Sequence, residues 1–460
     1  MGNSNYLIRI IAGALIISSF AMCSKSVNKI EKPAAQIPEQ NTAKQSLNTQ
    51  EVTNYTYTVK TTEWMVDGSS IPAGAIIYIP AGKRGSLLLK NFKGTAAAPI
   101  LVVNQGGRVS FTAETTASYA FKTQNCQYFK VLGNGFPTIR YGFDVNGGNI
   151  GMTMDDLSSD FEIAFVEVRN SGFAGIMAKT DPSCDPATWR GHFTMRNVVI
   201  HDNYVHKTGG EGLYVGNSFY EDGVSTSCGT VLPHDVANLK IHRNLVDSTG
   251  SEGIQVGSAT STCEVYNNTV KNPGQSPFAA YQDNGIQIGE GTGGKCYNNL
   301  IKNAPGNGII VLGLGDNLVY NNYIVNSKAY GIFADSRYTP GPNFQFINNT
   351  IVGSALGGIK LNSETIPMNT VINNVIIQSA SLEAIIRKSS DVKLTASNNY
   401  VNTDISVCMY VNFNKDEFHL LPSSPLIDKG ANVLSYGVKA DYFGAARPSG
   451  TAFDIGGTEY

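Results

Sequence analysis

Two short motifs of nearly identical sequence each place a glutamate directly before a glycine. They are TGGEG, which contains Glu211, and TGSEG, which contains Glu252, and Asp283 stands close to the same point of a third segment. Two carboxyl groups about 5 Å apart can act as the acid and the nucleophile of a retaining glycosidase, and a wider pair suits an inverting one. Such a pair also offers the oxygen ligands that Ca²⁺ prefers. We therefore take all three as candidate catalytic residues and as candidate ligands of calcium, the cofactor that this pattern suggests.

Candidate bases lie in the same part of the chain. His206 and Lys207 precede the first motif, and His234 ends the longest insertion. If the substrate is a uronate polymer, β-elimination needs a base at the C5 proton and a cation near the substrate carboxylate. If the substrate is a neutral glycan, the carboxyl groups alone would serve as acid and base or nucleophile. Both reactions stay open, and so does the purely local role that acidic residues often have in turns.

A polar and aromatic column accompanies these residues. Tyr214, Gln255 and Gln287 occupy the middle of GLYVG, GIQVG and GIQIG, where strand alternation turns a side chain away from the core. An aromatic ring and amides in this arrangement can stack on a sugar ring and bond its hydroxyl groups. Tyr220, in the insertion that follows Tyr214, is a further candidate contact. The same column would also be compatible with an ordinary solvated sheet face.

An internal repeat must position all of these side chains. An Asn recurs in motifs such as HRNLV, YNNTV and INNVI at positions 203, 244, 268, 299, 322, 349, 374 and 399, in steps of 41, 24, 31, 23, 27, 25 and 25 residues. A Gly-led strand with alternating apolar residues follows each of the first six. Units this short cannot bury their own apolar faces, so they must stack on one another. The repeat predicts an all-β parallel solenoid in which the Asn side chains form a ladder between coils.

The repeated motifs from Asn299 to Asn399 resemble the pectate-lyase-like superfamily of single-stranded right-handed parallel β-helices. The segment IPAGAIIYIPAGKRGSLLLKNF is similar to the first coil of β-helix proteins from bacterial polysaccharide-utilisation systems, and DYFGAARPSGTAFDIGGTEY resembles their closing segment. The resemblance implies a right-handed parallel β-helix that cleaves a polysaccharide as a lyase or a hydrolase. The NTD, DD, GHG and RIK series of polygalacturonases and the arginine signature of pectate lyases are both missing. A non-catalytic glycan-binding lipoprotein and a structural or adhesive solenoid are therefore the alternatives.

The N-terminus predicts export. Arg9 is followed by an apolar run over residues 10–17 and then by Cys23, an arrangement that resembles a bacterial lipobox. We expect a signal peptide at 1–22, a lipidated Cys23 with a disordered tether at 23–55, a β-helix at 56–420 and a closing segment at 421–460. The protein would then be a Bacteroidota-type lipoprotein of the cell envelope that meets the membrane only through its lipid.

The net charge limits the classes of partner that the protein is expected to bind. The formal charge is -2, so no basic field would hold a nucleic acid, and a monomer that binds a polysaccharide is expected.

Cys184 and Cys228 lie in the two insertions rich in Gly, Ser, Pro and Asp, and we expect a disulfide between them. Cys263 and Cys296 lie in apolar strands and are expected to be small core residues.

Overall fold

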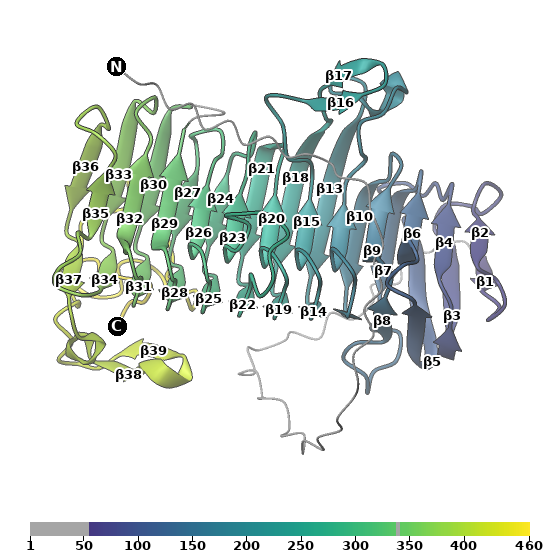
Figure 1. Cartoon of the computed structure of the whole chain (residues 1–460). Helices are drawn as coiled ribbons and strands as arrows, with labels where there is room; N and C mark the ends of the chain where they lie inside the picture. The colour runs from purple at the N-terminus through teal and green to yellow at the C-terminus, as the bar shows by residue number, and fades with distance from the viewer. Residues whose placement is uncertain (1–54, 337–340) are drawn as a thin grey trace, which may run out of the picture. The chain divides into compact units, whose positions relative to one another are not determined.

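The chain folds into a right-handed parallel β-helix, as the repeat predicts (Figure 1). This computed structural model describes residues 55–336 and 341–460. The expected signal peptide, Cys23 and nearly all of the expected tether lie outside the described residues. In the part that is described, no helix is long and apolar enough to cross a membrane.

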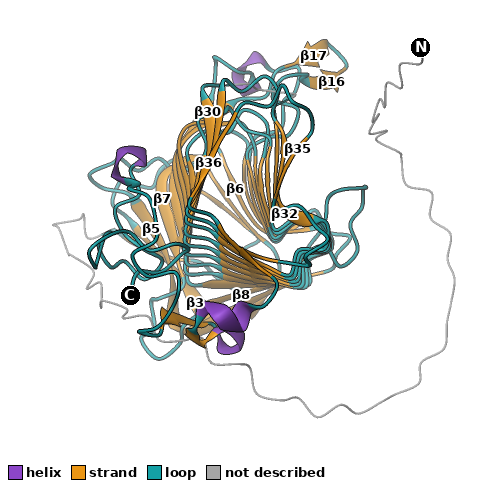
Figure 2. Ribbon diagram, turned by 90° about the vertical axis from the view of Figure 1, so that its left-hand side faces the viewer, coloured by secondary structure: helices purple, strands orange, loops and turns teal. Residues whose placement is uncertain are grey.

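Each coil contributes strands to three faces that run along the solenoid, and every pairing between coils is parallel (Figure 2). The first face consists of β1 (Thr56–Thr58), β3 (Ile76–Arg84), β5 (Ile100–Ala113), β7 (Gln127–Leu132), β10 (Ser159–Ala164), β13 (Thr194–His201), β18 (Asp235–His242), β21 (Ala259–Tyr266), β24 (Lys295–Tyr297), β27 (Leu318–Tyr320), β30 (Asn343–Ile347), β33 (Met368–Ile372) and β36 (Leu394–Ser397). The second consists of β8 (Phe143–Gly147), β11 (Val166–Arg169), β14 (Tyr204–His206), β19 (Leu245–Asp247), β22 (Thr269–Lys271), β25 (Leu300–Lys302), β28 (Tyr323–Val325), β31 (Thr350–Val352), β34 (Val375–Ile377) and β37 (Tyr400–Asn402).

The third face is a separate sheet, which we call the groove sheet because it carries the candidate site. It consists of β2 (Met65–Asp67), β4 (Leu87–Lys90), β6 (Tyr119–Gln124), β9 (Ile150–Asp155), β12 (Ile176–Ala178), β15 (Leu213–Val215), β20 (Ile254–Val256), β23 (Ile286–Ile288), β26 (Ile309–Val311), β29 (Tyr330–Asp335), β32 (Gly357–Asn362) and β35 (Ile385–Arg387). Helical structure in the described ranges is confined to the short 3₁₀ segments η1 (Pro186–Thr188), η2 (Ile405–Cys408), η3 (Phe413–Lys415) and η4 (Leu434–Tyr436).

The predicted Asn ladder lies at the turn between the first and second faces. Each Asn side chain donates to the Oδ1 of the ladder Asn in the next coil, as in Asn244 to Asn268 at 3.0 Å and Asn299 to Asn322 at 2.9 Å. The same Oδ1 atoms also accept from backbone N–H groups. These bonds satisfy polar groups in a turn that is closed to water, which explains why one residue type recurs at this position.

The residue before each ladder Asn has left-handed backbone geometry. The φ angle is 54° at Asn267, 53° at Asn321 and 58° at Asn373. Asn tolerates this region better than most residues, which accounts for the repeated Asn-Asn pairs.

Alternation along the Gly-led strands fills the interior. The inward positions that alternation predicts are fully buried at Leu213, Ile254 and Ile286, which are aligned by the strand register. Cys263 and Cys296 are also buried and unpaired, as expected of small core residues. The stacked coils therefore share one continuous apolar core.

The two long insertions meet beside the groove sheet. Cys184 and Cys228 form a disulfide with a Cα–Cα distance of 5.7 Å, the pairing that was predicted. The backbone of Arg190 donates to Leu232 at 3.1 Å, and the antiparallel hairpin of β16 (Val224–Thr226) and β17 (Gly229–Val231) projects above the solenoid (Figure 1). The two insertions thus form one covalently joined structure.

The C-terminal residues turn back along the outside of the coils. Solenoid strands end at Asn402, and β38 (Tyr410–Asn412) and β39 (Glu417–Leu420) form a separate antiparallel hairpin. Beyond it, the chain is bonded to the left-handed Asn residues of several coils: Asn321 donates to the Ala440 carbonyl and Asn373 to the Ala431 carbonyl, both at 2.9 Å. In the pairs from Asn298 to Asn398 the first Asn therefore holds the tail, while the second forms the inner ladder.

Candidate active site

A second column of polar residues lies at the turn that leads into the groove sheet. Two residues before the first inward position of each strand, successive coils carry Ala174, Glu211, Glu252, Asn284 and Asn307. Ala174 packs against the outward side chains of the same sheet, in a small cluster with neighbouring apolar groups. The column thus lies on the outer side of the groove sheet, although strict alternation would turn it inward.

Hydrogen bonds connect part of this column. The Asn284 amide donates to Glu252 Oε1 at 3.1 Å, and the Asn307 amide donates to Asn284 Oδ1 at 2.8 Å. The Oε2 atoms of Glu211 and Glu252 have no hydrogen-bond partner, and both residues are almost completely buried. Two adjacent carboxyl groups are therefore closed to water, with one oxygen of each unsatisfied.

The two carboxyl groups differ in their electrostatic surroundings. Burial raises the pKa of Glu211 to about 7, and the nearby Lys179 ammonium acts against this rise. Burial raises the pKa of Glu252 to about 8, and the charges of Glu211 and Asp283 add to the rise. Because two buried like charges in adjacent coils repel each other, the pair ionises in two steps, and the Lys179 ammonium favours the charged form of Glu211.

Lys179 is a residue that motif reasoning missed. Its Nζ lies 4.8 Å from the centre of the Tyr214 ring and 2.7 Å from Asp181. Although burial acts against its charge, Tyr214 and Asp181 raise the pKa of Lys179 above its ordinary value. It is therefore a permanent cation beside the pair. The sequence places Lys179 directly after the inward Ala178, at the first residue of the first insertion, and this position could have identified it as a candidate site residue.

The predicted polar column is in register, but much of it is covered. Tyr214, Gln255 and Gln287 pair along the sheet as expected. Ser218, from the following insertion, bonds the Tyr214 hydroxyl at 3.1 Å and the Gln255 amide at 2.9 Å. Tyr214 and Gln255 are consequently buried, and Gln287 is half-buried. One face of the Tyr214 ring is occupied by Lys179.

Tyr220 holds this cover in place. The Arg190 guanidinium lies 3.6 Å from the centre of its ring, and the ring rests against Gly291 in the loop after β23, two coils further along. Residues 217–223 therefore cover the polar groups of Tyr214 and Gln255 and extend to the loop after β23.

The predicted bases are held elsewhere. His234 is completely buried: its Nε2 accepts from the Thr180 N–H at 3.0 Å and its Nδ1 lies 2.9 Å from the Asp235 carbonyl, and burial lowers its pKa to about 4. His206 Nε2 lies 3.0 Å from Glu167 on the second face. Lys207 is exposed in the turn before Glu211. These hydrogen bonds of His206 and His234 involve neither Glu211 nor Glu252.

The expected calcium ligands do not converge. Asp283 is half-buried, and burial raises its pKa. Its carboxyl group lies against Gly306, where a Cβ would approach within 2.2 Å of Oδ1. Within residues 55–336 and 341–460, no three acidic, His or Cys side chains are arranged to hold a metal ion. The unsatisfied oxygens at Glu211 and Glu252 thus form a two-carboxylate site, which falls short of the six to eight oxygen ligands of Ca²⁺.

Fold and site together define a right-handed parallel β-helix with a buried acid pair on its outer sheet. A family model described as "Right handed beta helix region" matches residues 230–403. Among solved structures, the chain is similar to pectate lyase Pel9A, with a TM-score of 0.52 and 13% identity over 89% of this chain and 97% of that one. It is also similar to a GH136 lacto-N-biosidase from Eubacterium ramulus, with a TM-score of 0.50 and 14% identity over 76% of this chain and 68% of that one. A comparison with curated proteins gave no match. At these identities the likeness establishes the fold.

The acid pair also predicts how stability depends on pH. Both folded-state pKa values, about 7 and about 8, lie above the ordinary value for Glu, so the folded protein binds more protons than the unfolded chain at intermediate pH. The stability associated with these groups is complete below about pH 4 and is lost as the pH rises through 7 and 8. We expect the free energy of unfolding of a Glu211→Gln, Glu252→Gln double variant, relative to that of the wild type, to increase as the pH rises from 5 to 8. Each unit of pKa shift contributes about 1.4 kcal/mol.

Thermal melting by circular dichroism at pH 5, 6, 7 and 8 measures this difference. Glu383→Gln is the matched control, because Glu383 occupies the same turn position before β35 but is exposed. Parallel melting curves for the wild type and the double variant across this range would show that the pair has ordinary pKa values.

Proposed function

We propose that the protein is a carbohydrate-active enzyme that hydrolyses a glycan, with Glu252 as the general acid and Glu211 as the nucleophile. The observation that carries this proposal is the buried carboxyl pair in adjacent coils. The Lys179 ammonium favours the charged form of Glu211, whereas the charges of Glu211 and Asp283 disfavour the charged form of Glu252. Environments that separate the pKa values of two adjacent carboxyl groups assign the acid and the base roles. The pectate lyase and the lacto-N-biosidase that share the fold supply only the general substrate class, a glycan.

The geometry favours retention of configuration. β15 and β20 are adjacent and in register, with Leu213 opposite Ile254, so equivalent atoms of the two coils lie about 4.8 Å apart. Retaining enzymes use carboxyl groups about 5 to 5.5 Å apart. In this scheme Glu252 protonates the glycosidic oxygen while Glu211 attacks the anomeric carbon. Glu252 then removes a proton from the water that releases the sugar from Glu211.

Elimination is less well supported by the contacts. Lys179 remains protonated, and a base that is already charged cannot accept the C5 proton. Both ring nitrogens of His234 are engaged by the backbone, and His206 contacts Glu167. Lys207 is thus the remaining candidate base for a lyase.

Binding of a glycan to Tyr214 and Gln255 requires residues 217–223 to move. Ser218, which belongs to this segment, is hydrogen-bonded to both Tyr214 and Gln255. The carboxyl pair is also closed to solvent. A closed site that excludes water strengthens electrostatic interactions with the reacting groups. The glycan would displace the Ser218 contacts and bond the same amide and hydroxyl groups.

An activity screen of the purified protein, residues 24–460, tests this proposal. Neutral substrates (galactan, arabinan, xylan) and uronate substrates (polygalacturonate, alginate) are each incubated at pH 7.5. New reducing ends without absorbance from an unsaturated product support hydrolysis. Unsaturated products would replace the proposal with a lyase, and retention of a glycan without cleavage would replace it with a binding protein.

Export and lipid anchoring are also part of the proposal, on the strength of the N-terminal pattern of Arg9, the apolar run and Cys23. We expect the protein to take up radiolabelled palmitate in a bacterial host and to partition with membranes. Cys23→Ala should abolish both the label and the membrane fraction, while Cys126→Ala, which alters a buried core thiol, should keep both. A labelled Cys23→Ala variant would contradict the lipobox interpretation.

A further inference from the structure

An insertion on the opposite edge of the groove sheet exposes two aromatic side chains. Residues 273–283 connect β22 to β23, and within them Phe278 is 55% exposed and Tyr281 is 77% exposed. Exposed rings of this size leave apolar surface in water, and such patches commonly mark binding sites.

The insertion is fixed to the turns that carry the carboxyl pair. The backbone N–H groups of Gly274, Gln275 and Ser276 donate to carbonyl groups of residues 249–251, at 2.8, 2.8 and 3.0 Å. Residues 249–251 lead directly into Glu252. The insertion therefore lies over the edge of the acid pair and is held there by regular hydrogen bonds.

Phe278 reaches further, across the turn of Glu211. Its ring centre lies 5.6 Å from that of Phe173, which belongs to the turn before β12. Phe173 in turn packs against the outward cluster of Ala174, Met177 and Tyr214 and against Gly210. Phe278 thus bridges the coils on either side of both carboxyl groups.

Tyr281 is held in a position that stability alone does not explain. Its backbone has a φ of 67°, a left-handed conformation that is unfavourable for an aromatic residue. Its carbonyl accepts from the Asn284 amide at 2.9 Å, and the same amide donates to Glu252. One side chain therefore fixes both the exposed Tyr281 and the proposed general acid.

We propose that Phe278 and Tyr281 form a stacking platform for a pyranose ring of the glycan, directly beside the acid pair. Aromatic faces bind the apolar C–H faces of sugars, and the Tyr hydroxyl can bond a sugar hydroxyl at the rim. This inference rests on the proposed function for its ligand, because the glycan that stacks here is the one presented to Glu252. The platform selects a ring by its shape and carries no cation for a uronate carboxylate.

Binding and cleavage are measured separately so that the two proposals can fail independently. Affinity gels containing galactan, arabinan, xylan, polygalacturonate or alginate are run with the wild type and with Glu252→Gln. Tyr281→Ala and Phe278→Ala are then compared in the gel that retains both. Trp64→Ala is the matched control, because Trp64 is 64% exposed at the first coils of the groove sheet, away from this insertion.

We expect Tyr281→Ala and Phe278→Ala each to weaken retention about tenfold and to raise KM more than they lower kcat, with unchanged melting temperatures. Trp64→Ala should bind as the wild type does. The platform is refuted if both variants keep wild-type retention, or if none of the five gels retains the wild type. Retention that depends on Tyr281 without any cleavage would support the platform and refute the proposed hydrolase.

Discussion

Replacing Glu252 with Gln is expected to lower kcat/KM for glycan hydrolysis by about 10²–10⁴-fold, the usual contribution of a general acid. Gln has nearly the same shape and can still accept a hydrogen bond from Asn284, so the fold should be kept. The amide cannot give a proton to the departing glycosidic oxygen. Glu211→Gln should be at least as damaging, because it removes the nucleophile.

The pH profile distinguishes the roles of the two carboxyl groups. Only the singly protonated pair is active, so kcat/KM should rise as the pair loses its first proton near pH 7 and fall as it loses its second near pH 8. In Glu252→Gln the remaining activity should lose its alkaline limb. Substrates with a good leaving group, such as aryl glycosides, should recover much of the lost rate because they need no acid.

Glu383→Gln again provides the matched control for these measurements. It changes a carboxyl group at the same turn position, but in an exposed coil far along the groove sheet. Its kinetics should equal those of the wild type. Wild-type turnover in both Glu211→Gln and Glu252→Gln would mean that the carboxyl pair serves the fold alone.

The repeat fixed the fold because its residues act locally and in register. The ladder position of Asn268 and the inward position of Leu213 follow from spacing and strand alternation, and both appear as expected. The pairing of Cys184 with Cys228 rests on a different ground, their place in the two insertions rich in Gly, Ser, Pro and Asp, and the disulfide is formed.

Features that depend on contacts between different coils could not be predicted. The sequence shows Tyr214 and Gln255 on the outer face, but it does not show that Ser218 folds back to cover them. His234 looks like a base beside carboxylates, yet its ring is used to satisfy the backbone of Thr180. A repeat determines where a residue lies within its coil, whereas the conformation of an insertion depends on its contacts with other coils.

The Asn pairs illustrate a signal that was visible but could be only partly interpreted. Repetition of the second Asn required a ladder. The left-handed backbone favours Asn at the first position of each pair. Its second role became clear from the tail, as in Asn348, which donates to the Asp454 and Gly456 carbonyls at 2.9 Å each. The left-handed turn presents these amides outward, and the tail supplies the acceptors.

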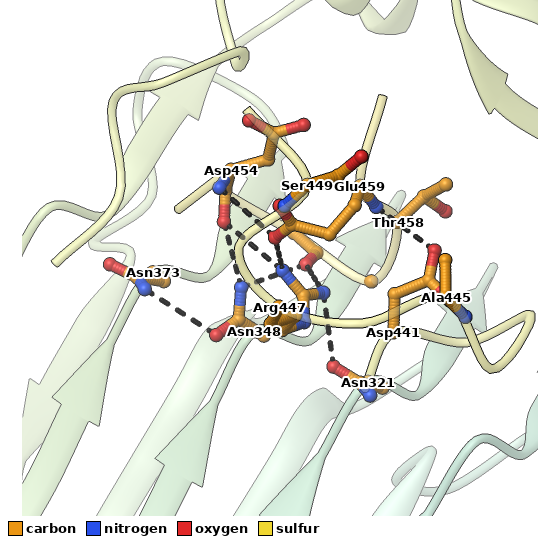
Figure 3. A network of polar contacts seen from close by, with 12 residues as sticks. Asn321, Asn348, Asn373, Asp441, Ala445, Arg447, Ser449, Asp454, Thr458 and Glu459 are labelled. Atoms are coloured by element: carbon orange, nitrogen blue, oxygen red, sulfur yellow. Dashed lines mark hydrogen bonds and ion pairs between the residues drawn. The ribbon is translucent and has the colours of Figure 1, made fainter. Parts of the chain in front are cut away.

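Arg447 secures this tail, and its replacement should have the largest effect on stability. Its side chain is completely buried and forms an ion pair with Glu459, which is buried as well. Figure 3 shows the guanidinium between Glu459 and Asn321, and it also donates to the Gly456 carbonyl at 2.7 Å. Arg447→Met would leave the Glu459 carboxylate buried without its cation, with the backbone N–H groups of Ser449 and Asp454 as its remaining donors.

We expect Arg447→Met to lower the free energy of unfolding by about 3–5 kcal/mol, the cost of breaking a buried ion pair. Arg447→Lys should fall between it and the wild type, because an ammonium keeps the charge but loses the fork of donors. Lys388→Met is the matched control: Lys388, which pairs with the half-buried Glu364 at 3.1 Å, is exposed, and pairs at the surface contribute about 0–1 kcal/mol. Urea unfolding gives the energies, and limited proteolysis should cut Arg447→Met first within residues 421–460. Equal losses in Arg447→Met and Lys388→Met would show that the tail is held by its Asn contacts alone.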